Sequence, residues 1–191
     1  DKNDMDPEVW VSEYGDYLYK YAYMRLGDKA SAEDAVQETF LAGFKARDKF
    51  NGRVPIKFWL RGILRHKVVD HIRKHARETK VEDFEQEEIV GKFIFKAFGI
   101  PERSPDPWKF NPQKAYERKE FWNVFYHCMD GMKGTMRQAF ALRELEGQST
   151  EEICKALDIQ PNNLWVILHR ARASLKVCLE KNWLTQSREE T

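Results

Sequence analysis

The pattern of hydrophobic and polar positions is clearest between Phe58 and Arg77, where it predicts one amphipathic α-helix. Apolar residues recur there at three- and four-residue intervals and therefore share one stripe: Leu60, Ile63, Leu64, Val68 and Ile72. The opposite side carries Arg65, His66, Arg73 and Arg77. Asp70 is the only acid beside seven Lys and Arg from Lys57 to Arg77. Because a solvated face normally mixes charge signs, this helix favours nucleic-acid binding over a plain charged surface.

A second helix is predicted to begin at Ser31, because Ser31-Ala32-Glu33-Asp34 has the pattern of a capping box. Its expected inward stripe consists of Val36, Phe40 and Phe44. One outer face then holds Asp34, Gln37, Glu38 and Leu41. A leucine among carboxylates and an amide suits a docking surface for a protein partner, although an ordinary helix surface has the same composition.

The chain before Ser31 predicts a helix with an aromatic stripe. Asp6 and Pro7 have the residue types of an N-cap and a first helical position, and Gly27 ends the pattern. The aromatic residues at helical spacing are Trp10, Tyr14, Tyr17 and Tyr21. They suit a stacking surface as well, but a core stripe is the commoner arrangement, and we assign them to the core.

A loop is predicted between the helix that begins at Ser31 and the helix from Phe58 to Arg77, because Asn51-Gly52 and Val54-Pro55 are typical turn pairs. Cations and aromatic rings are interleaved in and after it: Lys49, Phe50, Arg53, Lys57, Phe58, Trp59 and Arg61. Unstacked bases and a single-strand backbone bind to such mixtures. For Trp59, a place in the core is the alternative.

The composition changes after Arg77. Acidic residues crowd between Glu82 and Glu88, and prolines then recur up to Pro112, which predicts a linker over residues 78–111. Asn111 and Pro112 have the residue types of a new helix start. Its expected inward residues are Trp122, Phe125 and Met129.

The last part of the chain predicts a helix-turn-helix motif. Ser149 to Glu152 is another capping box, and a short turn at Asp158 precedes Pro161, which opens the final helix. The core face of that helix is expected to hold Leu164, Ile167, Leu168, Ala171 and Leu175. The outward face is expected to hold Asn162, Val166, His169, Arg170, Ala173 and Lys176.

The residue types on this final helix suit DNA. Near the start of a recognition helix, amides bond adenine edges and small apolar groups touch thymine methyls, while later cations hold phosphates. The first task fits Asn162, Asn163 and Val166. The second fits Arg170, Arg172 and Lys176. Many three-helix bundles use the same turn without touching DNA, so the motif alone leaves both interpretations open.

The composition is that of a globular protein with no overall basic charge. The chain has 191 residues, 42% of them hydrophobic, and a net charge of only +1, so nucleic-acid contacts must come from local charge. No apolar run approaches the roughly 20 residues that cross a bilayer, and the first residues lack the apolar segment of a signal peptide. We therefore expect a soluble, cytoplasmic protein.

Neither the cysteines nor the acidic residues indicate a catalytic or metal site. Cys128, Cys154 and Cys178 form no CxxC pair and leave an odd thiol, which argues against a disulfide framework and a closed zinc site. Reduced, buried thiols are expected instead. No nucleophile, base and orienting acid stand at a suggestive spacing, and there is no Gly-rich phosphate loop. We expect no enzymatic activity, no cofactor and no metal.

The order of these motifs resembles the sigma factors of bacterial RNA polymerase, in particular the compact extracytoplasmic-function type. The family's polymerase-docking helix, melting loop and minus-ten-reading helix are similar to SAEDAVQETFLAGF followed by DKFNGRVPIKFWLRGILRHKVVDHIRK. Its minus-thirty-five module is similar to RELEGQSTEEICKALDI followed by LHRARASL. The resemblance implies an all-α fold with two helical domains, residues 6–77 and 112–184, joined by the linker 78–111 and followed by a tail, 185–191.

The resemblance also implies roles for the residues singled out above. The polymerase-binding residues would be Asp34, Gln37, Glu38 and Leu41. The minus-ten DNA would contact Lys49, Phe50, Asn51, Arg53, Lys57, Trp59, Arg61, Arg65, His66 and Arg73. The minus-thirty-five DNA would contact Asn162, Asn163, Val166, His169, Arg170, Arg172 and Lys176. The implied partners are core RNA polymerase, promoter DNA and an anti-sigma factor. Trp165 stands where many family members carry lysine.

Two other functions fit parts of the sequence. A helix-turn-helix regulator would bind duplex DNA without polymerase, and it would not need the docking helix or the aromatic loop. An interaction protein would sequester a partner through the face from Asp34 to Leu41, and it would show no promoter preference. A gel shift with and without polymerase distinguishes these functions from a sigma factor.

Overall fold

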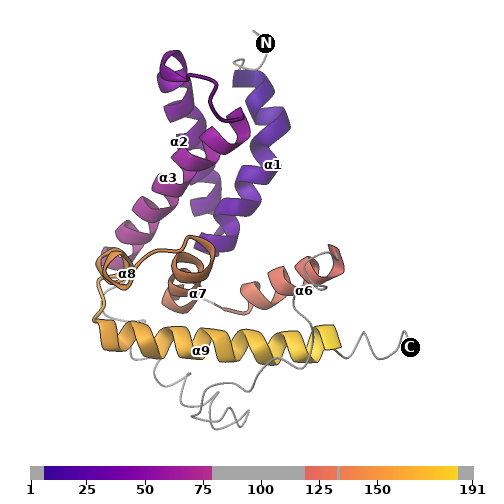
Figure 1. Cartoon of the computed structure of the whole chain (residues 1–191), viewed down its shortest axis with the longest axis vertical. Helices are drawn as coiled ribbons and strands as arrows, with labels where there is room; N and C mark the ends of the chain where they lie inside the picture. Colours follow the sequence, from indigo (N-terminus) through magenta and orange to yellow (C-terminus); the bar gives the residue numbers. More distant parts are fainter. Residues whose placement is uncertain (1–6, 79–118, 133, 185–191) are drawn as a thin grey trace. The chain divides into compact units, whose positions relative to one another are not determined.

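The computed structural model describes residues 7–78, 119–132 and 134–184. Within these ranges there are seven α-helices and no strand, so the predicted all-α class is confirmed there (Figure 1). By its internal contacts the chain divides into two compact units, Asp1–Arg77 and Glu78–Thr191. The predicted N-cap Asp6, most of the predicted linker, the expected helix start at Asn111 and the tail 185–191 lie outside the described residues.

The first unit contains three long helices. They are α1 (Pro7–Leu26), α2 (Lys29–Ala46) and α3 (Ile56–Glu78), and a 3₁₀ turn, Arg47–Lys49, leads from α2 into the loop before α3. The core lies between the helices and contains Trp10, Leu18, Ala22, Ala35, Leu60, Leu64, Val68 and Ile72. The predicted stripe of α3 is buried apart from Ile63, which is half-buried. In α1 only Trp10 of the four aromatic residues is fully buried, and the three tyrosines are half-buried.

The inward face of α2 differs from the predicted one. Phe44 is 45% exposed, whereas Thr39 and Gly43 are buried together with three other small residues: Ala32, Ala35 and Val36. A Cβ atom added to Gly43 would lie 2.9 Å from Cδ2 of Leu60 and 3.3 Å from the Trp10 ring. Because the helices pack this closely, small residues face the core and the Phe44 ring is turned outward. Of the predicted stripe, Val36 is buried as expected and Phe40 is half-buried.

The N-terminus of α2 also lies earlier than predicted. Asp28 is the N-cap, and its Oδ2 accepts a hydrogen bond from the backbone N–H of Ser31 at 2.8 Å. Ser31 is therefore inside the first turn, and its predicted role as N-cap is wrong. The same hydrogen bond is the main cause that lowers the pKa of Asp28.

The described part of the second unit contains four α-helices. They are α6 (Lys119–Asp130), α7 (Gly134–Phe140), α8 (Thr150–Leu157) and α9 (Pro161–Leu179). A π-helical turn, Ala141–Leu145, follows α7, and another, Glu180–Leu184, follows α9. The largest fully buried side chains of this core are Met129, Met132, Leu142, Ile153, Leu164 and Leu179.

The helix-turn-helix geometry follows from the cap that begins α8 and from the turn that joins α8 to α9. Ser149 Oγ accepts from the Glu152 N–H at 3.2 Å, and Glu152 Oε2 accepts from the Ser149 N–H at 2.8 Å, so the predicted capping box is confirmed. Asp158 ends α8 with a left-handed φ of 55°, and Pro161 then opens α9. The predicted core stripe of α9 is buried except for half-buried Ile167, but Ala173, expected outside, is buried as well.

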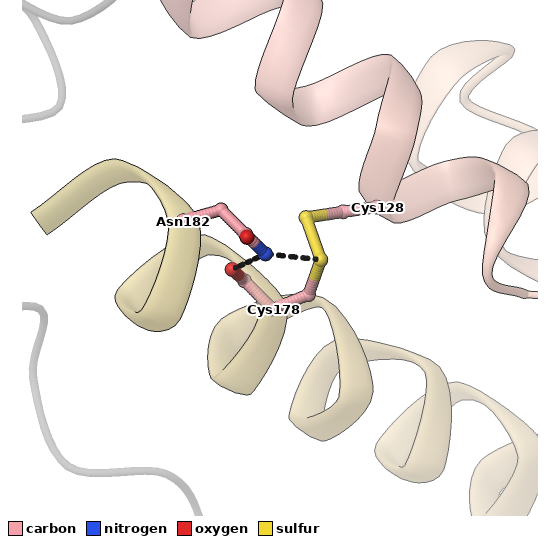
Figure 2. The surroundings of a disulfide bond; sticks show 3 residues. All are labelled: Cys128, Cys178 and Asn182. Atoms are coloured by element: carbon pink, nitrogen blue, oxygen red, sulfur yellow. Dashed lines mark hydrogen bonds between the residues drawn. A yellow bond between two sulfur atoms is a disulfide. The ribbon is translucent and has the colours of Figure 1, made fainter. Parts of the chain in front are cut away.

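The cysteines are not all reduced, so that expectation is wrong. Cys128 of α6 and Cys178 of α9 form a disulfide bond (Figure 2). Cys154 of α8 is a free, half-buried thiol, and burial raises its pKa. The two bonded residues are 50 positions apart, and helical periodicity within each segment does not show that α6 and α9 pack together.

Candidate functional site

In the first unit, two cations at the start of α3 are held against an aromatic side chain of α1. Nζ of Lys57 lies 4.0 Å from the centre of the Tyr17 ring, and Nη1 of Arg61 donates to the Tyr17 hydroxyl at 3.3 Å. The guanidinium of Arg61 also lies 5.0 Å from the Phe58 ring centre. These partners are uncharged, so they orient the cations without neutralising them. The sequence spacing assigns Tyr17 to the core, whereas the structure leaves it half-buried against these two cations.

Further along α3 the predicted basic face is exposed to solvent. Arg65 and His66 are exposed, and Arg73 is half-buried with Nη1 3.7 Å from Oδ1 of Asp70. Nε of Arg73 is buried and has no hydrogen-bond partner within the described ranges. The face therefore keeps an excess of positive charge along more than two turns of helix.

The loop before α3 is folded back onto its aromatic neighbours. The ring of Phe50 lies 4.9 Å from that of Trp59, and Trp59 in turn meets Trp10 edge-on at 6.0 Å. Both Phe50 and Trp59 are half-buried, whereas Phe58 is 47% exposed. Oδ1 of Asn51 accepts the backbone N–H of Arg53 at 3.1 Å, which stabilises the turn. Lys49, Asn51 and Arg53 are exposed.

The outer face of α2 brings the predicted docking residues together. Asp34, Gln37 and Glu38 are exposed, and Leu41 is 61% exposed. Phe44, which sequence reasoning placed in the core, lies one turn after Leu41, and the Arg47 guanidinium covers its ring at 4.2 Å. Two large apolar side chains therefore stand next to an acidic turn, an arrangement typical of protein interfaces.

Glu38 connects this face of α2 to α3. Its carboxylate lies 3.0 Å from Nζ of Lys67 and 3.5 Å from Nε2 of His71. The hydrogen bond from Lys67 is the main cause that lowers the pKa of Glu38. The carboxylate is therefore ionised and fixed in position at neutral pH.

In the second unit, the start of α9 presents an open surface. Asn162, Asn163 and Val166 are exposed, as predicted for residues that reach base edges. Trp165 lies among them with 70% of its surface exposed, and its ring stacks on His169 at 5.7 Å. Sequence reasoning gave Trp165 no role, although its position on the outward face was available from the helical spacing.

The later cations of α9 are paired with carboxylates. Arg172 donates to Oε1 of Glu144 at 2.6 Å and 3.1 Å, and Nζ of Lys176 lies 3.8 Å from Oε1 of Glu180. Arg170 is half-buried, as are His169 and Lys176, whereas Arg172 is exposed. The phosphate-binding charge predicted for α9 is therefore partly neutralised within the unit.

Two further features bear on the chemistry that these units support. Among residues 7–78, 119–132 and 134–184, no cluster of three or more His, Cys, Asp or Glu side chains could hold a metal ion. Of the helices in the same ranges, none combines the length and hydropathy that crossing a bilayer requires.

Comparison with known proteins finds a family match in each of the two units. The sigma-70 region 2 model matches residues 10–78, and the sigma-70 region 4 model matches residues 123–175. A probable RNA polymerase sigma factor of Haemophilus influenzae is 32% identical over 165 residues, which cover 86% of this chain and 84% of the relative. The chain belongs to the sigma-70 family of RNA polymerase sigma factors and, within it, to the extracytoplasmic-function type.

Two more distant relatives are consistent with this assignment. The ECF RNA polymerase sigma factor SigE of Mycolicibacterium smegmatis is 26% identical over 90% of this chain and 61% of the relative. The ECF RNA polymerase sigma factor SigX of Bacillus subtilis is 25% identical over 91% of this chain and 83% of the relative. Sigma factors are generally non-enzymatic regulators of transcription initiation.

Proposed function

We propose that this sigma factor binds core RNA polymerase through the outer face of α2 and reads promoter DNA with α3 and α9. The observation that carries the proposal is the exposure of Leu41. Leu41 is 61% exposed and lies between the acidic turn of α2 and the ring of Phe44. A partner that covers this side chain removes its apolar surface from water, which stabilises the complex. The docking residues are then Asp34, Gln37, Glu38 and Leu41, with Phe44 added.

The domain boundaries that go with this function are residues 6–77 for polymerase binding and minus-ten recognition, and 112–184 for minus-thirty-five recognition. Residues 78–111 join the two domains. The protein acts in the cytoplasm, where polymerase and promoter DNA are found, and an anti-sigma factor is a further partner. It has no enzymatic activity of its own and needs no cofactor.

The first unit acts on the minus-ten element and on the unpaired strand. Lys57 and Arg61 keep their charge because Tyr17 and Phe58 are neutral, and phosphates can therefore bind them directly. The nearby loop holds Phe50 against Trp59 beside Asn51, so a base that leaves the duplex meets an aromatic surface and an amide. Stacking on such a surface is worth roughly 1 to 3 kcal/mol per base.

The second unit binds the minus-thirty-five element as duplex DNA. Asn162, Asn163 and Val166 read base edges from the first turns of α9. Trp165 adds a broad apolar surface in the same turns, suited to thymine methyl groups and sugar edges. Phosphates are bound by Arg170, Arg172 and Lys176. The last two must first separate from their carboxylate partners.

Capture of core polymerase tests the docking assignment. Leu41→Asp places a charge in the centre of the proposed interface and should reduce capture at least tenfold without loss of helix content, since Leu41 is exposed. Val11→Asp is the matched control, because Val11 is also a well exposed apolar residue of the first unit but lies on α1. Equal capture by both variants would contradict the docking assignment. Duplex promoter binding that does not depend on polymerase would instead favour a helix-turn-helix regulator.

A further inference from the structure

The disulfide between Cys128 and Cys178 connects the first and last described helices of the second unit. Cys128 is buried on α6, while Cys178 is half-buried on the last turn of α9 (Figure 2). Cys154, the third cysteine, is not bonded. The pairing is therefore selective, and its two residues differ in burial.

The environment of Cys178 suits a sulfur that exchanges partners. Nδ2 of Asn182 donates to the backbone oxygen of Cys178 at 2.8 Å and to Sγ of Cys178 at 3.4 Å (Figure 2). A donor beside a sulfur stabilises the thiolate relative to the thiol, and the thiolate is the reactive form. The less buried cysteine is thus also the one with a hydrogen-bond donor at its sulfur.

The second unit has a core that does not depend on this bond alone. Besides the disulfide, the rings of Phe121 and Trp183 meet edge-on at 5.6 Å and are both buried. The turn between α8 and α9 is held by left-handed Asp158, by the hydrogen bond that the Ile159 N–H donates to the Cys154 backbone oxygen at 3.1 Å, and by buried Leu164, far along α9 from Cys178. Opening the bond therefore leaves the helix-turn-helix folded, and α6 loses only its covalent connection to α9.

We propose that Cys128 and Cys178 are a reversible thiol-oxidation site, which low-molecular-weight disulfides close and thiols reopen. This inference rests on the proposed function in one respect, namely that the protein is in the cytoplasm. Thiol buffers there can reduce a disulfide, so the bond is reversible rather than permanent. The regulated property is the attachment of α6 to the recognition helix α9.

The reaction balances with a small disulfide as the oxidant. The Cys178 thiolate attacks one sulfur of the small disulfide, forms a mixed disulfide and releases one small thiol. The Cys128 thiolate then attacks Sγ of Cys178 and releases the second small thiol. Two protein thiols are oxidised, one small disulfide is reduced to two thiols, and the two protons pass to the released thiols.

A redox titration of the full chain tests this site. The protein is equilibrated without oxygen in mixtures of reduced and oxidised glutathione, quenched with acid and alkylated, and each cysteine is followed by mass spectrometry of its peptide. Cys128 and Cys178 should convert together, and a tenfold change in the ratio of oxidised glutathione to the square of reduced glutathione should change the disulfide-to-dithiol ratio tenfold. Cys154 should stay a thiol, and Cys154→Ser should leave the titration unchanged.

Single variants test the order of attack. In Cys128→Ala, the remaining Cys178 should form a mixed disulfide with glutathione much faster than Cys128 does in Cys178→Ala. The proposal is overturned if wild-type Cys128 and Cys178 stay reduced in every mixture, if the bond resists dithiothreitol in the folded protein, if Cys154 takes part, or if the order of the variants is reversed. The titration uses neither DNA nor polymerase, so a failure of the proposed promoter function would leave its result unaffected.

Discussion

The two units hold the cations that we propose to bind DNA in different ways. In the first unit, Lys57 and Arg61 lie against Tyr17, a neutral partner. In the second, Arg172 lies against the carboxylate of Glu144 and Lys176 against that of Glu180. An aromatic ring orients a cation and leaves its charge available, whereas a carboxylate neutralises it. Lys57 and Arg61 are therefore available to phosphate, whereas Arg172 and Lys176 must leave their carboxylate partners before they bind it.

The largest effect is expected from removing the available charge of the first unit. Lys57→Ala with Arg61→Ala should lower the affinity of the polymerase-bound chain for single-stranded minus-ten DNA by about tenfold to a hundredfold at low salt. The slope of log affinity against log salt should become shallower by about 1.4, since each single-strand phosphate contact contributes about 0.7. Fluorescence anisotropy over a salt series measures both quantities. Lys20→Ala with Lys29→Ala removes the same charge from exposed positions outside the site and should change neither quantity substantially.

A smaller effect of opposite sign is expected in the second unit. Glu144→Gln removes the carboxylate that holds Arg172 and should raise the affinity for minus-thirty-five duplex by a factor of about 1.4 to 5, because an exposed ion pair is worth about 0.2 to 1 kcal/mol. The freed cation should also steepen the salt dependence. Glu120→Gln makes the same change of charge on α6, outside the helix-turn-helix. If both variants behave alike, the ion pair does not limit DNA binding.

Replacing Tyr17 should change the affinity for minus-ten DNA by a similar or smaller factor. Tyr17→Leu removes both the ring beneath Lys57 and the hydroxyl that accepts from Arg61, so minus-ten affinity should fall about two- to fivefold, from a cation–π interaction of about 0.5 to 1 kcal/mol at an exposed site. Tyr17→Phe keeps the ring, and its minus-ten affinity should lie between those of wild type and Tyr17→Leu. Equal affinity of all three proteins, with unchanged stability, would show that Tyr17 does not position these cations.

The smallest effect is expected from the pH dependence of the Glu38 ion pairs. Folding lowers the pKa of Glu38, chiefly through the hydrogen bond from Lys67, so the folded state favours the carboxylate. This stabilisation is complete above the pKa of an unfolded glutamate, about 4.3, and is lost as pH falls through the lower pKa of folded Glu38. Solvent screening keeps it below about 1 kcal/mol. Urea unfolding at pH 7 and pH 3 should show a smaller loss of stability for Glu38→Gln than for wild type.

Sequence periodicity predicted the helices and most of their buried stripes, because a 3.6-residue repeat is a local property of the chain. It placed Leu60, Leu64 and Val68 of α3 correctly, and it identified the capping box at Ser149. It failed where packing between helices decides the outcome. Gly43 is buried and Phe44 is exposed because α2 approaches Leu60 and Trp10 too closely for a ring.

Contacts between residues that are far apart in the sequence could not be predicted either. No local pattern indicates that Tyr17 meets Arg61, that Arg172 meets Glu144, or that Cys128 bonds to Cys178. The spacing of the outer residues of α9 did predict an exposed surface at Asn162 and Val166. It could equally have included Trp165, since the same helical count places that ring on the outside.

Permanganate reactivity of promoter thymines tests the division between the two units most directly. Core polymerase with this chain is used to select a promoter from genomic DNA, and opening of its minus-ten region is then followed for two double variants. Phe50→Ala with Asn51→Ala should leave duplex binding nearly intact and reduce thymine reactivity, because the aromatic loop of the first unit is assigned to the unpaired strand. Arg170→Ala with Lys176→Ala should weaken duplex binding before any opening. Normal thymine reactivity in the loop variant, or normal duplex binding with impaired opening in the α9 variant, would contradict this account.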